Sequence, residues 1–289
     1  MTSYALRDLD VFYISFDEPN SDANWTRVLQ QCQHAKRIHG VIGFDRAHKA
    51  CAIGSTTDRF VTIDGDNWLN DNALNNVIDD TGVEDACFSF KSRNVINGLE
   101  YGNGGVKVWN RQVLLSSNTH EQSSTTDFCW DIRYFQIDVI ASTTVTNCSP
   151  YQAWRAGYRE GVKMSYIDGM PIGDFKRDWH MIWKGNLSRL AMWCSVGRDV
   201  DNGIWAMLGA RQGLYELVSG SIPNTMINDY QWFPKRFQDI AGSDADAMAR
   251  WYAERLGNEY DFVVPELDAQ MSAWMKMVYV NPSRHGLMR

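Results

Sequence analysis

The stretch that most constrains this chain is 60–67, Phe-Val-Thr-Ile-Asp-Gly-Asp-Asn, where an apolar run leads directly into two carboxylates. The apolar run predicts a buried strand that surfaces at the aspartates. Open α/β sheets bind ligands at that carboxyl edge. Side chains two residues apart on an extended chain point the same way, so Asp64 and Asp66 are expected to face one cation. Such oxygen ligands suit Mg²⁺ or Mn²⁺ with substrate phosphates, and Gly65 would let a diphosphate approach closely. The same pattern also occurs at ordinary solvated strand ends.

The residues on the amino-terminal side of this stretch predict alternating strands and helices. Apolar runs at 10–16, 36–41 and 60–64 are typical of strands. Two amphipathic stretches between them, 25–32 and 45–53, are typical of helices. This order predicts a βαβαβ unit of parallel sheet with right-handed crossovers, and therefore an α/β fold.

Polar residues after the first strand and on the second helix are the next candidates. Ser15, Asp17 and Glu18 stand where a parallel sheet commonly holds the base and ribose of a nucleotide. His48 and Lys49 are candidates for contact with the diphosphate. The alternative is a plain loop after the strand and a solvated lysine on the helix.

The stretch 94–109 carries four glycines, Gly98, Gly102, Gly104 and Gly105. We expect a loop with unusual backbone angles that leads into a strand. It matches neither a phosphate-binding loop of the Walker type nor a dinucleotide-binding fingerprint, because no helix follows the glycines. Either the backbone comes close to a sugar or diphosphate, with Lys107 nearby, or the stretch is a glycine-rich hairpin. The segment 116–126 is polar and is expected to be mobile.

The second half of the chain is predicted to be mainly helical. A helix opens at Pro150 and carries Arg155 and Arg159 one turn apart, which points either to a phosphate ligand or to salt bridges with nearby acids. Apolar residues at helical spacing continue from Asp178 to the closing helix at 266–277. We therefore place a soft boundary that separates residues 1–150 from residues 151–289.

Composition limits the class of protein. The chain has 289 residues and a formal net charge of −7, which gives no general footprint for nucleic acid. No apolar run reaches the ~20 residues of a membrane span, and the first ten residues lack the apolar core of a signal peptide. The six cysteines form no Cys-x-x-Cys pair and predict reduced core thiols. We expect a cytoplasmic protein with no membrane partner; its oligomeric state is left open.

Several motifs together resemble a family of glycosyltransferases of the GT-A fold from tailed bacteriophages. The resemblance covers roughly the first 165 residues and rests on these motifs: Ile14–Asn20, Asn24-Trp25, His39–Val41, Ala47–Lys49, Asp64–Asp66, Asn97–Lys107, Asp127-Phe128 and Trp154-Arg155. It implies a GT-A-like, Rossmann-type αβα sandwich with a helical carboxyl-terminal part. It also implies a metal-dependent transferase that uses a UDP-sugar, with Asp64 and Asp66 as the metal-binding Asp-x-Asp. Phage enzymes of this kind add glucose or arabinose to hydroxymethylated bases, such as hydroxymethylcytosine, in their own DNA. A phage-encoded enzyme would work in the cytoplasm of the host cell.

The pattern of residues and the resemblance together give the expected role of each residue. Asp127 is the first choice for a catalytic carboxylate and Glu160 the second. Gly104, Gly105 and Lys107 would shape the donor side, and Tyr101 the acceptor side. A local DNA-binding patch would consist of Arg155, Arg159, Lys176 and Arg177. His180 is a candidate third metal ligand, although a histidine beside Trp179 is more often structural.

Two other classes of protein remain open at this point. A sugar nucleotidyltransferase would also bind a metal ion and a nucleotide, but it needs a glycine-rich, lysine-bearing loop where this chain has Asp17–Asn20. The other is a non-catalytic nucleic-acid-binding protein with the same fold.

Overall fold

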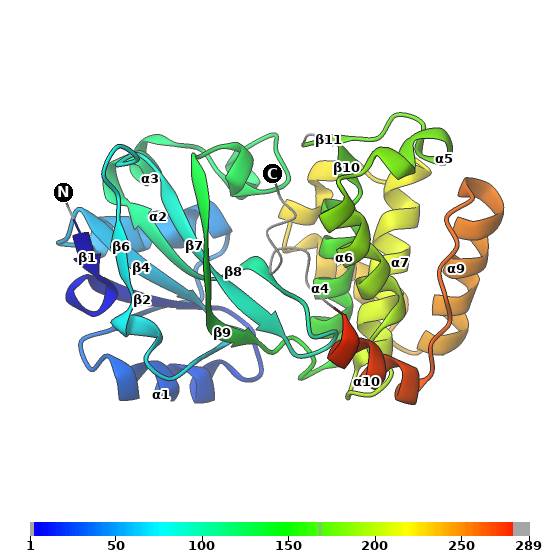
Figure 1. Ribbon diagram of the computed structural model, residues 1–289, viewed down its shortest axis with the longest axis horizontal. Helices are drawn as coiled ribbons and strands as arrows, with labels where there is room; N and C mark the ends of the chain where they lie inside the picture. Colours follow the sequence, from blue (N-terminus) through cyan, green and yellow to red (C-terminus); the bar gives the residue numbers. More distant parts are fainter. Residues whose placement is uncertain (1–2, 168, 280–289) are drawn as a thin grey trace. The chain divides into compact units, whose positions relative to one another are not determined.

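The computed structural model describes residues 3–167 and 169–279. The chain divides into two compact units, shown in Figure 1. The first consists of Met1–Asn94 and Glu100–Val145, and the second of Val95–Leu99 and Thr146–Arg289. The division therefore falls at Val145, before the expected boundary at 150, and the short segment Val95–Leu99 belongs to the second unit. Each unit is described by itself.

The first unit is built on a mixed seven-stranded sheet in the order β3-β2-β4-β8-β7-β9-β5. Its strands are β2 (Asp10–Ser15), β3 (Lys36–His39), β4 (Arg59–Asp64), β5 (Asn67–Leu69), β7 (Cys87–Asn94), β8 (Glu100–Asn110) and β9 (Tyr134–Thr144). Strands β3, β2 and β4 are parallel, and β8 pairs antiparallel with both β4 and β7. Helices α1 (Ser21–Gln31) and α2 (Phe44–Gly54) connect the parallel strands, so the predicted βαβαβ unit and the α/β class are confirmed.

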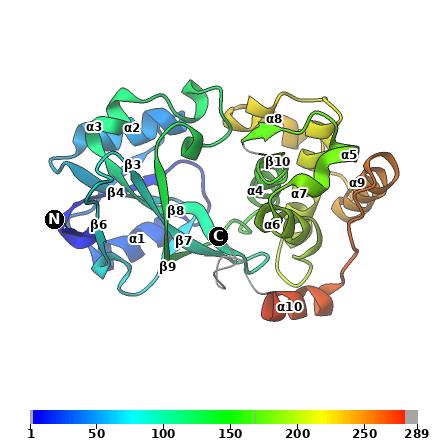
Figure 2. The ribbon, with the colours of Figure 1, turned by 45° about the horizontal axis from the view of Figure 1, so that its top comes forward.

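The sheet lies between two helical layers. Side chains alternate along β2, so that Tyr13 packs towards α1, in one apolar cluster with Val28, whereas Phe12 packs in a second cluster with Cys51 of α2. Helix α3 (Arg111–Ser116) joins the second cluster. Both views show α2 and α3 on one side of the sheet and α1 on the other (Figure 1 and Figure 2).

The glycine-rich stretch differs from the expectation of a loop. From Glu100 it forms the continuous strand β8, antiparallel to β7 as in the hairpin alternative. Of Gly98, Gly102 and Gly105, only Gly98, before the strand, has a positive φ, +72°. The described glycines within β8 make room for neighbouring side chains. A Cβ on Gly102 would overlap the Tyr134 hydroxyl, and one on Gly105 would lie 2.5 Å from the Ser142 hydroxyl. These positions are therefore glycine because of close packing and not because of a turn.

Residues 67–80 are polar and rich in Asn and Asp, yet they contain short pieces of regular structure. Strand β5 begins at Asn67, a 3-10 turn η2 covers Ala73–Asn75, and β6 (Val77–Asp79) pairs antiparallel with β1 (Ser3–Ala5). Three-residue strands are too short to show a period in the sequence.

The polar segment around 116–126, expected to be mobile, is tied to α2. Glu121, in the 3-10 turn η3 (His120–Gln122), accepts hydrogen bonds from the backbone N–H of Asp45 (3.1 Å) and of Arg46 (3.4 Å) at the start of α2. Asp45 in turn accepts from the backbone and hydroxyl of Thr119. A carboxylate at a helix amino terminus is favourable because it meets unpaired N–H groups and the positive end of the helix dipole.

The second unit is mainly helical. Its α-helices are α4 (Pro150–Lys163), α5 (Phe175–Asp178), α6 (Lys184–Ser195), α7 (Gly203–Val218), α8 (Trp232–Gln238), α9 (Ala245–Tyr260) and α10 (Ala269–Val278). A small hairpin pairs β10 (Tyr166–Ile167) with β11 (Met170–Pro171). Helix α7 is central and packs on α4, α6 and α9. Within residues 3–167 and 169–279, no helix has both the length and the apolar character needed to cross a bilayer.

Helices α4 and α7 approach each other through glycines spaced four residues apart. A Cβ on Gly157 or Gly161 would overlap the carbonyl oxygen of Ala206 or Ala210 of α7. On α7, a Cβ on Gly209 would meet the Trp154 carbonyl of α4 in the same way. Residues four apart share one helix face, so each helix presents a smooth groove to the backbone of the other.

The cysteines only partly follow the expectation of core thiols. Cys32, Cys51, Cys87 and Cys194 are buried, and burial raises the pKa of each, that of Cys194 to about 12. Cys148, by contrast, is exposed and Cys129 is half-buried. The structure forms no disulfide among these six described cysteines.

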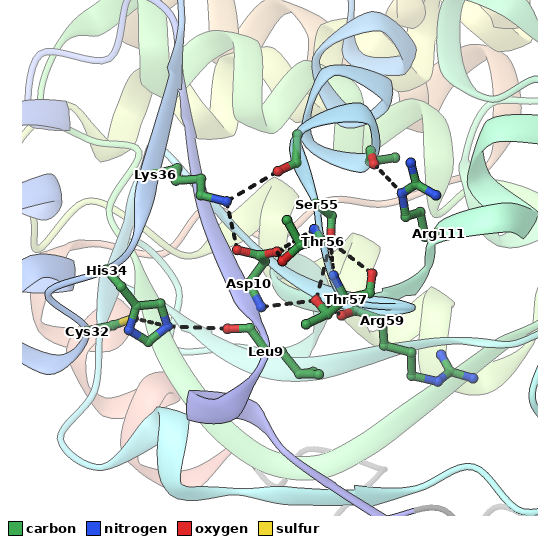
Figure 3. Close-up of polar contacts among 12 residues, drawn as sticks. Leu9, Asp10, Cys32, His34, Lys36, Ser55, Thr56, Thr57, Arg59 and Arg111 are labelled. Carbon is green, nitrogen blue, oxygen red and sulfur yellow. Dashed lines mark hydrogen bonds and ion pairs between the residues drawn. The ribbon is translucent and has the colours of Figure 1, made fainter.

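A polar cluster fixes the amino ends of β2, β3 and β4 (Figure 3). Asp10 of β2 accepts hydrogen bonds from Lys36 Nζ (2.8 Å) and from the backbone N–H (2.6 Å) and hydroxyl (2.8 Å) of Thr56. Burial by itself would raise the pKa of Asp10, but the bonds from Lys36 and Thr56 outweigh it and lower this pKa to about 2.

The Asp10→Asn variant is expected to lose about 2 kcal/mol of unfolding free energy at pH 7, because a pKa shift of nearly two units corresponds to that amount. A carboxyl group with a depressed pKa contributes its stability above its unfolded-state pKa and loses it as the pH falls through the folded one. The gap between wild type and variant should therefore close between about pH 4 and pH 2 in urea titrations. Asp79→Asn is the comparison: bonds from Thr81 in its own turn also lower the pKa of Asp79, but this carboxylate is exposed, so its variant should show a smaller gap of the same sign. A gap that is independent of pH would contradict the prediction.

Candidate functional site

The three parallel strands end together and bring predicted site residues to one edge. Ser15 of β2 is in register with His39 of β3, and Ile14 is in register with Asp64 of β4. We call the residues at these strand ends the carboxyl edge: Ser15–Glu18, His39 and Asp64–Asp66. The convergence of the residues after the first and third strands is what a parallel sheet requires.

Ser15 is buried at this edge by two residues that the sequence analysis missed. Its Oγ lies 3.0 Å from His39 Nδ1 and accepts a hydrogen bond from Arg37 Nε at 2.9 Å. Arg37 also donates to Asp22 at 2.7 Å and lies over the Tyr13 ring. The signal was the position of Arg37 and His39 in the second strand, beside the first.

Two hydrogen bonds fix the carbonyl of Gly65, between the two aspartates. The carbonyl of Gly65 accepts hydrogen bonds from Tyr13 Oη (2.7 Å) and from Asn24 Nδ2 (2.9 Å). A Cβ on Gly65 would lie 2.7 Å from Glu18 Oε2 and 2.9 Å from the Ile14 carbonyl. Glycine at this position therefore lets the Glu18 carboxylate come close to the Asp64–Asp66 turn.

Asp66 and Glu18 both act on Tyr13. Burial raises the pKa of Tyr13, and the negative charges of Glu18 and Asp66 raise it further, so both carboxylates lie within electrostatic reach of its hydroxyl. Asp66 Oδ1 accepts a hydrogen bond from Asn67 Nδ2 at 2.6 Å. Asn67 is itself fixed, because its Oδ1 accepts from the hydroxyls of Ser142 and Thr144, both at 2.9 Å. Asn67 is a positioning residue that the sequence analysis did not identify.

Asp64 makes a different set of contacts. Its Oδ2 pairs with Lys107 Nζ at 3.1 Å, and its Oδ1 is buried with no hydrogen-bond partner among the described residues. Lys107, on β8 opposite Thr62, is only 4% exposed and lies over the ring of Phe128 at 5.5 Å. Lys107 was predicted to lie near the site, but its ion pair with Asp64 was not foreseen.

His48 and Lys49, predicted to contact the diphosphate, both have partners within the first unit. His48 is fully buried, with its ring 5.0 Å from that of Trp109, and its Nδ1 donates to the Phe44 carbonyl at 2.8 Å. Burial and the charge of Lys107 lower its pKa to about 4, which keeps the ring neutral. Lys49 pairs with Asp45 at 2.9 Å. The structure thus gives both residues packing and pairing contacts on α2.

Asp127 lies on the same side of the sheet as Lys107. It precedes the 3-10 turn η4 (Phe128–Trp130) and accepts from the backbone N–H of Cys129 at 3.4 Å. Burial raises the pKa of Tyr134, and the charge of Asp127 contributes, which places this carboxylate near Tyr134. Tyr101, Gly104 and Gly105 all lie within β8, with Tyr101 buried.

The other predicted residues lie in the second unit. Glu160 pairs with Lys163 at 3.3 Å on α4. Arg155 and Arg159 both lie over the ring of Tyr230, at 5.3 Å and 5.0 Å. The remaining residues have these neighbours: Lys176 pairs with Asp261, Arg177 with Asp178, and His180 lies beside Trp179. Lys176 and Arg177 thus each pair with a carboxylate, and Arg155 and Arg159 share the Tyr230 ring.

No protein-family model matches this chain, and no curated protein matches it. What the protein does must therefore be argued from the geometry of the site.

The carboxyl edge provides suitable ligands for a divalent cation. Across the part of the chain that the structure describes, no three His, Cys, Asp or Glu side chains form a ready metal cage. Mg²⁺ commonly binds proteins through only one or two carboxylates and takes its other ligands from substrate phosphates and water. Asp66 and the unpaired Oδ1 of Asp64 fit that kind of site. The residues present therefore fit a cation that binds together with a diphosphate.

A cavity of about 380 Å³ lies at the opposite edge of the sheet. Its lining includes Leu9, Thr56 and Thr57, which lie at or before the amino ends of β2 and β4. Ligands of open α/β sheets bind at the carboxyl ends of the strands, so we do not place the functional site in this cavity.

Proposed function

We propose that the protein is a metal-dependent glycosyltransferase of the GT-A type. It would move a glucosyl or arabinosyl group from a UDP-sugar to a hydroxymethylated pyrimidine in DNA. The observation that carries the proposal is the grouping of Ser15, Glu18, Asp64 and Asp66, with Lys107 behind them, at the carboxyl edge of three parallel strands. The resemblance of the first 165 or so residues to phage glycosyltransferases supplies the substrate class.

Each group at the edge has a role that its surroundings support. Asp64 and Asp66 would hold a Mn²⁺ or Mg²⁺ ion, which neutralises the charge that develops on the departing UDP. Ser15 ends β2 and Glu18 follows in the loop after it, where they would hold the ribose and base. Lys107 contributes a positive charge behind Asp64. Asp127 would accept the proton of the attacking hydroxyl or orient the sugar.

The resemblance suggests DNA as the acceptor. A hydroxymethyl group on C5 of a pyrimidine projects into the major groove, where a protein can reach it. Arg155 and Arg159, which both lie over the ring of Tyr230, would supply positive charge for a backbone phosphate. The nucleotidyltransferase alternative is less well supported, since no lysine lies in the loop after β2.

The proposal is tested by mass spectrometry. Duplex DNA that contains hydroxymethylcytosine is incubated with the protein, Mn²⁺ and each of a panel of UDP-sugars, with unmodified duplex and EDTA as controls. We expect a mass gain of one hexose or one pentose on the modified duplex alone, abolished by EDTA. Release of UDP without a gain on DNA would retain the transferase and replace the acceptor. No gain and no UDP release, together with tight DNA binding, would favour a binding protein and overturn the proposal.

A further inference from the structure

Lys107 places a positive charge inside the candidate metal site. Its Nζ lies 3.1 Å from Asp64 Oδ2, and only 4% of its side chain is exposed. Lys107 is fixed in the middle of the sheet, where β8 pairs with both β4 and β7. The ring of Phe128 packs on it, and buried His48 lies within its electrostatic reach. The ammonium group therefore cannot swing away from Asp64 as a surface lysine would.

This position affects cations and anions in opposite ways. An ion that coordinates Asp64 through its other oxygen would lie roughly 5 Å from Lys107 Nζ, given metal–oxygen distances of about 2 Å. A divalent and a univalent cation at that separation repel each other by an amount equivalent to about tenfold in affinity, even at a water-like dielectric constant. The same charge attracts a diphosphate.

We propose that Lys107 couples the binding of the divalent cation to that of the nucleoside diphosphate. It weakens the binding of the cation alone and strengthens the binding of the diphosphate, so that the cation is held well only together with the diphosphate. This inference rests on the proposed function, because it takes Asp64 as a metal ligand. Lys107 acts in it as a positioning residue through its charge.

The test compares Lys107→Met with Lys91→Met. Lys91 is the matched control, because it is also a buried sheet lysine, 3% exposed, and it pairs with Asp138 on the neighbouring strands β7 and β9. Two affinities are measured for each protein: that of Mn²⁺ alone, by electron paramagnetic resonance, and that of UDP at saturating Mn²⁺, by calorimetry. We expect Lys107→Met to bind Mn²⁺ alone about tenfold more tightly and UDP about tenfold more weakly, with Lys91→Met unchanged in both.

The opposite signs separate coupling from simple damage to the fold, which would weaken both affinities. If Lys107→Met does not fold, Lys107→Gln keeps a donor towards Asp64 without the charge and is expected to shift both affinities in the same directions. Unchanged or weaker Mn²⁺ binding in the folded variant would overturn the inference and leave the proposed function standing. Failure of the wild-type protein to bind Mn²⁺, with or without UDP, would overturn both.

Discussion

Alanine at Gly157 is expected to lower the free energy of unfolding of the second unit by about 1–3 kcal/mol. The added methyl group would overlap the carbonyl oxygen of Ala206, which is helix backbone and cannot rotate away. Helices α4 and α7 would have to separate, and this loosens the hydrogen bond from Trp154 Nε1 to Gln212 (2.9 Å) and the one from Tyr158 to Glu216 (2.5 Å). The higher helix propensity of alanine returns only about 1 kcal/mol.

Gly257→Ala provides the matched control. Gly257 lies in α9, and a Cβ there would meet nothing within 4 Å, so this variant should be more stable than wild type by up to about 1 kcal/mol. Urea unfolding followed by tryptophan fluorescence measures both variants. Gly161→Ala added to Gly157→Ala should cost less than its own separate effect, because helices that have already moved apart accommodate a second methyl group. A Gly157→Ala protein as stable as wild type would show that the two helices are not in contact.

The Asp66→Asn variant is expected to lose about a thousandfold in sugar transfer. The substitution removes the charge that would hold the cation but preserves the shape of the side chain. An asparagine Oδ1 can still accept the hydrogen bond from Asn67 Nδ2, so the Asp64–Asp66 turn should stay in place. Transfer is measured by UDP release and by the mass of the DNA product. Affinity for Mn²⁺ should fall in parallel, while the midpoint of urea unfolding stays near that of wild type.

Asp71→Asn is the control for this loss. Asp71 is an exposed carboxylate of the same unit that pairs with Arg27, so its neutralisation changes the net charge by the same amount away from the carboxyl edge. Transfer by Asp71→Asn should match wild type. An Asp66→Asn enzyme that retains transfer would rule out Asp66 as a metal ligand.

The central part of the fold could be predicted because its strands are buried on both faces. The runs at 10–16 and 60–64 have few polar interruptions, and the helices between them show a clear apolar spacing. A strand was expected after the glycines, but the extension of β8 through Gly102 and Gly105 could not be predicted, because glycine occurs both in turns and at close contacts. Only the tertiary structure shows that Tyr134 and Ser142 occupy the space where side chains on Gly102 and Gly105 would lie.

The candidate site also has one part that the sequence could predict and one that it could not. The order of the strands places Ser15, Glu18, Asp64 and Asp66 together, since the ends of parallel strands share an edge. The sequence could not show which face of α2 is buried, so the full burial of His48 was not foreseen. The pairing of Lys107 with Asp64 depends on β8 lying beside β4, a pairing that joins segments more than forty residues apart.

The segment Val95–Leu99 determines whether the second unit can be produced without the first. It links two strands of the first unit, yet Ile96 and Leu99 are fully buried, and Gly197 of the second unit packs against Ile96. A gene fragment that starts at Thr146 would lack both side chains, and each such loss from a core costs about 2–5 kcal/mol. The helical unit is therefore not an autonomous carboxyl-terminal module. Producing it alone would require a graft that carries 95–99 with it.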